Sequence, residues 1–301
     1  MGAMSRGRAR VGMCAVAALA GGCASGLLGE APGADAGAGA TFDAGFVPET
    51  AAPDAPADAP GATDGGADGQ APGPDACASR ALRPWEGAGI STAYVKGDAL
   101  TVISGDRYWA FDLVAGTWGA HGHVETLWAT APQVDGRRPW EGVGVDTSWV
   151  YGAMQTIISG DLYWTVDSVS GAWGASGHVE ALWANAPANE GALPWNAPGV
   201  QTAYPYQNGL TVISGDHDWV LDIPSNGWVA GKLETSWAGV PAIDAKLPWQ
   251  DTGVSASWVY GGIQTILSGD RYWLLKLSDG TWTTGHLETP WANVPLVDDC
   301  K

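Results

Sequence analysis

Short runs of hydrophobic residues, bounded by Gly, Ser or Asp, follow one another from about residue 81 onward, and this pattern predicts β-strands. Residues 144–186 illustrate it. Ser159-Gly160-Asp161 supplies a Gly-containing turn, and residues 179–186, which end before Pro187, predict a short helix. Four strands rich in β-branched and aromatic residues are expected in this stretch: 144–151, 154–158, 162–166 and a short one at 172–173.

The same pattern occurs four times along the chain. A Ser-Gly-Asp turn recurs every 54 or 55 residues, and a Pro-Trp pair recurs with the same spacing. The 18 tryptophans all fall at one of five positions of the repeat, on the Pro-Trp pair, the third strand, the fourth strand, the closing segment or, in two copies, the first strand. The Pro-Trp pairs contain Trp85, Trp140, Trp195 and Trp249.

A single unit of this size cannot bury both faces of its sheet, so the four units must stack on one another. Four stacked four-stranded sheets predict an all-β fold, a four-bladed β-propeller whose radial closure leaves only short, protected edges. A β-sandwich made of repeat pairs is the alternative. The propeller is expected to span residues 77–301, with blades at about 81–136, 137–192, 193–246 and 247–301.

Two cysteines bracket the repeats and favour the ring. Cys77 precedes the first copy and Cys300 ends the last, and a propeller brings its first and last blades together. We therefore predict a disulfide between Cys77 and Cys300. Closing so long a loop stabilises a fold by up to about 5 kcal/mol in the chain-entropy model, and secretion makes the bond chemically allowed.

The third strand carries a motif, Gly-Asp-x-Tyr-Trp, that is similar to hemopexin-like repeats. The first, second and fourth copies hold it at residues 105–109, 160–164 and 269–273, and a closing Gly-x-(Val/Leu)-Glu-x-x-Trp element and the bracketing cysteines extend the resemblance over residues 77–300. The third copy departs from the motif, because Asp218 stands where Tyr is expected. The units are also somewhat longer than is usual for the family.

The resemblance implies a central channel in which backbone carbonyls of the first strands hold a cation. Oxygen ligands suit Ca²⁺ or Na⁺, and a channel that holds only water or chloride is the alternative. Copies two and four share Ser-Trp-Val-Tyr-Gly on the first strand, whereas copies one and three share Thr-Ala-Tyr, so pseudo-two-fold symmetry is expected near the axis. Carried over by position, the ring of cation ligands is Ser91, Asp146, Gln201 and Ser255.

The N-terminus predicts export. Residues 1–22 combine three arginines with an apolar run too short to span a bilayer, which is typical of a signal peptide. Leu19-Ala20-Gly21-Gly22-Cys23 resembles a bacterial lipobox, so Cys23 is expected to carry a lipid. An ordinary signal peptide cleaved nearby is the alternative. The lipid would place the protein in the cell envelope, at the outer membrane or the cell surface, on a membrane anchor.

Residues 23–76 are expected to be a disordered linker, because they consist mainly of Ala, Gly, Pro and Asp, contain no Lys or Arg and cannot bury enough apolar surface to fold. The whole chain has a formal net charge of −18, from 32 acidic and 14 basic residues. Such a charge repels phosphate and argues against nucleic acid as a partner.

The chain offers little for catalysis or for haem. Its acids recur in every repeat, as turn and capping residues do, and no nucleophile elbow, zinc-protease or phosphate-binding motif is present. We therefore predict that the protein is not an enzyme. His123, His178 and His286 share one repeat position, which Lys232 occupies in the third copy, and this indicates a structural hydrogen bond near the blade connector. No residue matches the histidines that ligate haem in hemopexin.

These observations predict a surface-tethered binding module for a protein, a matrix polymer or a small ligand. One alternative is a multivalent lectin, in which sugars stack on the Pro-Trp set named above, the set most exposed by its place in a connector. Another is capture of haem or a polyamine in the channel. Fold alone does not identify the ligand.

Overall fold

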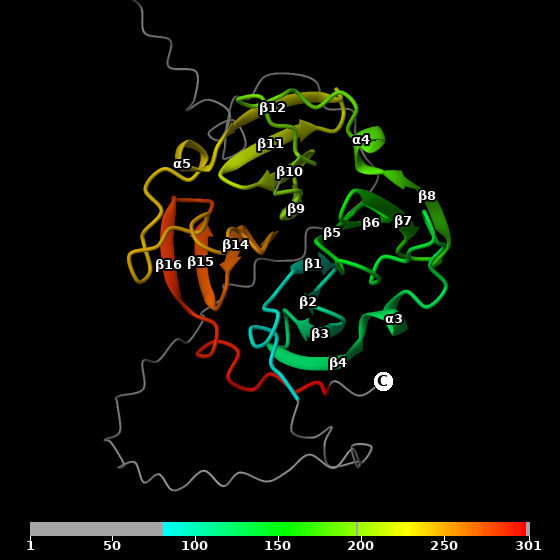
Figure 1. The fold of residues 1–301 in the computed structure, drawn as a ribbon. Coiled ribbons are helices and arrows are strands. Elements are labelled where there is room, and N and C mark those ends of the chain that lie inside the picture. The colour runs from blue at the N-terminus through cyan, green and yellow to red at the C-terminus, as the bar shows by residue number, and fades with distance from the viewer. Residues whose placement is uncertain (1–80, 197, 299–301) are drawn as a thin grey trace, which may run out of the picture. The chain divides into compact units, whose positions relative to one another are not determined.

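A computed structural model describes residues 81–196 and 198–298 of the chain (Figure 1). These residues form sixteen strands in four antiparallel sheets, and within each sheet the strands pair in chain order. The four sheets are β1 (Thr92–Lys96), β2 (Ala99–Ser104), β3 (Arg107–Asp112) and β4 (Thr117–His123); β5 (Thr147–Tyr151), β6 (Met154–Ser159), β7 (Leu162–Asp167) and β8 (Trp173–His178); β9 (Thr202–Tyr206), β10 (Gly209–Ser214), β11 (His217–Asp222) and β12 (Gly227–Lys232); and β13 (Ala256–Tyr260), β14 (Ile263–Ser268), β15 (Arg271–Lys276) and β16 (Thr281–His286).

The sheets are arranged radially. The first strand of each sheet lies nearest the centre and packs against the first strands of its two neighbours, and β13 packs against β1 (Figure 1). The fold is therefore a four-bladed β-propeller, as predicted from the repeats, and the β-sandwich alternative was wrong. Blades 1 to 4 follow the order of the chain.

The ring closes where the first and last blades meet. Leu82 and Val297 form an isolated antiparallel bridge, with N···O distances of 2.9 and 3.1 Å. Trp109 on β3 donates its indole N–H to the carbonyl of Pro295 at 2.7 Å. The predicted disulfide partners Cys77 and Cys300, the lipidation site Cys23, the signal peptide and the linker all lie outside the described residues.

The largest fully buried side chains are the third-strand tryptophans, which join neighbouring blades. Each is at most 1% exposed and donates its indole N–H to a proline carbonyl in the connector that precedes its blade. Because the donor is satisfied, the ring can be buried without the penalty for an unpaired polar group. The other three pairs are Trp164 with Pro132 (2.9 Å), Trp219 with Pro187 (2.9 Å) and Trp273 with Pro241 (2.8 Å).

Two elements differ from the sequence prediction. The fourth strand of blade 2, expected at residues 172–173, is β8 and runs to His178, because pairing with β7 offsets the low strand propensity of its Gly, Ala and Ser residues. The helices are single turns, at α3 (Val124–Leu127), α4 (Val179–Leu182) and α5 (Leu233–Ser236). Blade 4 has turns in place of this helix, consistent with Pro290, which has no N–H to donate. Across residues 81–196 and 198–298, no helix is long and apolar enough to cross a membrane.

Candidate functional site

The innermost strands surround a cavity of about 230 Å³ on the propeller axis. No Lys, Arg, His, Asp or Glu is among the described residues that line it, so the channel is electrically neutral apart from its backbone dipoles. Alternate residues of each innermost strand belong to its lining, as expected where strand residues face an axis, and aromatic residues between them contribute as well. The alternate residues are Ala93 and Val95, Ser148 and Val150, Ala203 and Pro205, and Ser257 and Val259.

Threonine hydroxyls join neighbouring blades around this cavity. In three of the four blades the first residue of the innermost strand is a buried Thr, whose hydroxyl accepts a backbone N–H from the next blade. Blade 4 has Ala256 at this position, so its side chain offers no oxygen to blade 1. The three bonds run from Ser148 to Thr92 (3.1 Å), from Ala203 to Thr147 (2.8 Å) and from Ser257 to Thr202 (3.1 Å).

The residues predicted to form the cation ring each come directly before an innermost strand, and their side chains are bonded within their own blades. The Ser91 and Ser255 hydroxyls donate to the carbonyls of Ile103 and Leu267, both at 3.2 Å. The Asp146 carboxylate accepts the N–H of Gly160, and Gln201 accepts that of Gly215 at 2.9 Å. None of the four is among the described residues that line the axial cavity.

Burial raises the pKa of Asp146, and the hydrogen bond from Gly160 opposes that rise. Asp146 is the only acid in the predicted ring. Within the described ranges, no three His, Cys, Asp or Glu side chains are grouped so that they could hold a metal ion.

The contacts between blades alternate around the axis. Where blade 1 meets blade 2, Tyr94 hydrogen-bonds Gln155, and where blade 3 meets blade 4, the Gln264 amide donates to the Tyr204 hydroxyl at 2.7 Å. At the other two seams an aromatic ring faces an apolar partner. Trp149 there shares a buried cluster with Leu210, and Trp258 shares one with Leu100. The pseudo-two-fold symmetry expected from the sequence is thus a property of the blade contacts.

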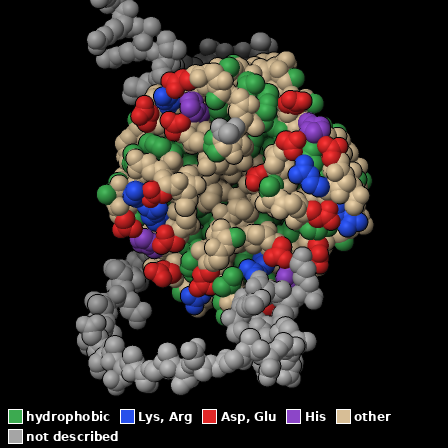
Figure 2. All heavy atoms as spheres, in the orientation of Figure 1, with side chains coloured by type: hydrophobic (Ala, Val, Ile, Leu, Met, Phe, Trp, Pro, Cys, Tyr) green, Lys and Arg blue, Asp and Glu red, His purple; other side chains and the backbone are tan. Residues whose placement is uncertain are grey.

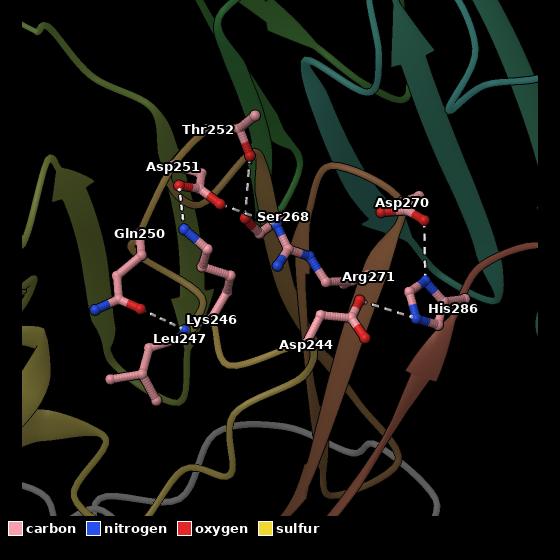
Figure 3. A network of polar contacts seen from close by, with 10 residues as sticks. All are labelled: Asp244, Lys246, Leu247, Gln250, Asp251, Thr252, Ser268, Asp270, Arg271 and His286. Carbon is pink, nitrogen blue, oxygen red and sulfur yellow. Dashed lines mark hydrogen bonds and ion pairs between the residues drawn. The ribbon is translucent and has the colours of Figure 1, made fainter.

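Charged side chains gather toward the rim, where they join each blade to the connector before it (Figures 2 and 3). In blade 4, His286 lies between Asp270 on its own blade (2.9 Å) and Asp244 on the connector (3.4 Å). Nearby, Asp251 pairs with Lys246 at 2.9 Å and lies 3.8 Å from Arg271 (Figure 3).

The same arrangement recurs in the other blades. His178 lies between Asp161 (3.1 Å) and Asp135 (3.2 Å), and in blade 3 Lys232 takes the histidine's place and pairs with Glu190 at 2.9 Å. His123 Nδ1 lies 3.3 Å from Asp106. The structural interpretation of these histidines and of Lys232 is confirmed. Hydrogen bonding to Lys232 lowers the pKa of Glu190.

The Pro-Trp tryptophans are half-buried, and in two blades another residue covers the ring. Trp85 lies 6.2 Å from Trp291, and Trp249 lies 6.2 Å from Trp237, measured between ring centroids. Guanidinium groups stand 5.8 Å from two of the rings, Arg83 over Trp85 and Arg138 over Trp140. Trp195 and Trp249 follow Leu193 and Leu247 at the corresponding positions and have no such cation.

Sequence reasoning missed one cavity, which lies between blades 3 and 4 beside Asp218. The departure of Asp218 from the motif was visible in the sequence. The accompanying signal is Ser236, which stands where blades 1 and 2 have Leu127 and Leu182. Together, Asp218 and Ser236 make polar a position of the repeat that is occupied by Tyr and Leu in blades 1 and 2.

Comparison with solved structures finds the same fold in several plant proteins. A hemopexin-fold protein, CP4 from cow pea, matches with a TM-score of 0.52 and 11% identity over 67% of this chain and 95% of that one. A 2S albumin seed protein from Dolichos matches with 0.53 and 13% over 68% and 99%. A plant lectin with two metal-binding sites from Cicer arietinum matches with 0.51 and 12% over 67% and 95%.

No protein-family model and no curated protein matches the sequence. At these identities the likeness defines the fold alone. The chain is a four-bladed β-propeller, and its structural neighbours include a protein described as having the hemopexin fold.

Proposed function

We propose that this protein is a non-enzymatic binding module held at the surface of the cell envelope. The proposal rests on which side chains are used in bonds between blades and connectors and which line the axial cavity. The histidines and their partner acids are taken up in bonds that recur from blade to blade, whereas the axis keeps a neutral cavity of about 230 Å³. Catalytic groups are normally gathered at one asymmetric place, so this arrangement supports binding.

The proposed tether is a lipid on Cys23, and residues 24–76 would act as a spacer that holds the propeller away from the membrane. A disulfide between Cys77 and Cys300 would lock the ring beside the Leu82–Val297 bridge. In the channel, main-chain carbonyls at the ring of four positions named above would hold Ca²⁺ or Na⁺.

The test is thermal unfolding of the full chain with Ca²⁺, with a chelator and with a panel of glycans, haem and polyamines, because a ligand that binds only the folded state raises Tm. We expect at least one ligand to raise Tm in the wild type and to do so less in Val95→Phe, which narrows the channel. Shifts that are absent for every ligand, together with no partner captured at the cell surface, would contradict the proposal. Release of the protein from the membrane by Cys23→Ser tests the tether separately.

A lectin is the second candidate, favoured by the half-buried rings of Trp195 and Trp249, over which no guanidinium group of the described residues stands. It predicts that Trp195→Ala with Trp249→Ala abolishes glycan binding, whereas Trp85→Ala with Trp140→Ala weakens it less. Equal losses in the two pairs, or no loss in either, would remove this candidate.

A further inference from the structure

Blade 3 differs from the other blades at two facing positions. The second residue of its third strand is Asp218, where the other blades have Tyr108, Tyr163 and Tyr272. The last residue of α5 is Ser236, and its hydroxyl donates to Asp218 Oδ2 at 2.9 Å. One change has therefore removed an aromatic ring, and the other has supplied a polar partner for its replacement.

A glycine that accommodates the ring remains in blade 3. In blade 2, Tyr163 is paired with Gly177, and a Cβ added to that glycine would lie 3.5 Å from the tyrosine ring. Gly231 occupies the corresponding position opposite Asp218. A Cβ added there would meet Asp218 Oδ1 at 3.1 Å. The glycine is kept, but a carboxylate lies against it and leaves part of the space of a tyrosine ring unfilled.

The space opens into a cavity of about 100 Å³ between blades 3 and 4. About 10–15 Å³ on this measure holds one water molecule, so the cavity has room for several waters or for a ligand of a few heavy atoms. Blade 3 contributes Asp218, Ser236, Tyr206 and Trp237 to its wall, and blade 4 contributes aliphatic side chains that include Leu275 and Leu277.

Asp218 brings an incompletely bonded carboxylate to this cavity. It is 6% exposed, and its Oδ1 has no hydrogen-bond partner within the described part of the chain. It is also the only carboxylate among the described lining residues. Burial raises its pKa, and the hydrogen bonds from Ser236 and from its own backbone N–H, together with the nearby His217, oppose that rise. A buried acceptor without a donor is unfavourable until something supplies one.

We propose that this cavity binds a primary ammonium group carried on a short apolar chain. The ammonium would donate to Asp218 Oδ1 once the side chain turns this atom from Gly231 toward the cavity, and so supply the missing partner with a charge-assisted bond. Tyr206 and Trp237 offer ring faces to the cation, and Leu275 and Leu277 offer apolar surface to the alkyl chain. One carboxylate matches one ammonium, so a monoamine is preferred to a diamine of equal length. The site is separate from the axial channel and does not depend on its function.

The experiment is a titration of the full chain with n-propylammonium, followed by calorimetry and by the indole resonance of Trp237. Propan-1-ol is the neutral ligand of the same size, and 1,3-diaminopropane is the dication. We expect saturable binding of propylammonium, binding at least about tenfold weaker for Asp218→Asn, and no binding to Asp218→Tyr, which restores the residue of the other blades. Asp222→Asn removes an exposed charge from the same strand and is expected to bind as the wild type does.

Three results would overturn the proposal: no saturable binding by the wild type, equal binding of propan-1-ol, or binding retained by Asp218→Tyr. A cooperative melt of Asp218→Tyr shows that loss of binding is not loss of the fold. Tighter binding of the diamine would contradict the preference for a single charge.

Discussion

Two of the seams between neighbouring blades share a Tyr–Gln contact but differ in the residues that pack beside it. Between blades 1 and 2, Tyr94 meets Gln155, and Tyr108 and Leu127 pack against the cluster beside this pair. Between blades 3 and 4, Tyr204 meets Gln264, but the residues in the corresponding slot are Asp218 and Ser236. We call the first the closed seam and the second the open seam.

This difference shows that one blade can lose core packing at one position while its remaining hydrogen bonds to the neighbouring blade hold the ring together. The open seam retains the hydrogen bond from Ser257 to Thr202 and the bond from the Trp273 indole to Pro241. Repeated bonds therefore carry the fold, and the position that departs from the repeat is where the proposed ligand would bind.

Opening the closed seam should have the largest effect. Tyr108→Asp with Leu127→Ser removes a ring and an aliphatic side chain and places a carboxylate in an apolar cluster. We expect a loss of about 3–5 kcal/mol in the free energy of unfolding, measured in guanidinium. The reverse exchange, Asp218→Tyr with Ser236→Leu, should stabilise the open seam. If both double variants changed the free energy of unfolding by equal and small amounts, the two positions would not be equivalent.

Gln155→Leu should have the next largest effect, because Gln155 donates to Ser148 Oγ at 3.0 Å and hydrogen-bonds Tyr94. Losing both bonds is expected to cost about 2 kcal/mol by the same measurement, although Ser148 still donates to the Thr156 carbonyl. Adding Tyr94→Trp reproduces the Trp–Leu contact of the neighbouring seams and should recover part of the loss. Strictly additive effects of the two substitutions would argue against paired contacts.

Asp218→Asn should change how stability depends on pH. Because burial raises the pKa of Asp218 in the folded state, the folded protein holds that proton more tightly than the unfolded chain does. Wild-type stability is then lost as pH rises through the folded pKa, above the unfolded value of about 3.9. Asn lacks this penalty and should add about 1–2 kcal/mol at neutral pH and nothing in acid. Parallel stability curves for the two proteins would contradict the shift.

The smallest effects concern the threonine bonds at the axis. Ala256→Thr would give blade 4 the hydroxyl that the other blades have and should stabilise the ring by about 1 kcal/mol. Thr147→Val is the matched loss, because it removes the acceptor for the N–H of Ala203 at 2.8 Å. A change of the same sign for both variants in thermal unfolding would mean that packing at these buried sites outweighs the hydrogen bond.

The repeat spacing predicted the propeller because every blade must present the same surfaces to its neighbours. The shared positions of His123, His178 and His286 likewise predicted a bond that recurs in each blade. The end of β8 was missed because its Gly, Ala and Ser residues have low strand propensity, and pairing with β7 supplies what the local sequence lacks.

The cavity of the open seam could be predicted only in part. The sequence marks Asp218 as an exception, and comparison of the closing segments marks Ser236. It does not say that Leu275 and Leu277 of blade 4 complete the wall, because that depends on how two blades meet. The sequence shows a carboxylate at a position where the other blades have a tyrosine ring. Only the three-dimensional arrangement shows that a cavity lies beside it.

The most direct test of the open seam as a ligand site is an NMR titration of the ¹³C-labelled Asp218 carboxylate in the full chain, with and without propylammonium. The account predicts a pKa above the ordinary range for Asp in the free protein and a lower pKa when the amine is bound, because a neighbouring cation favours the ionised form. An ordinary pKa that the amine leaves unchanged would contradict it.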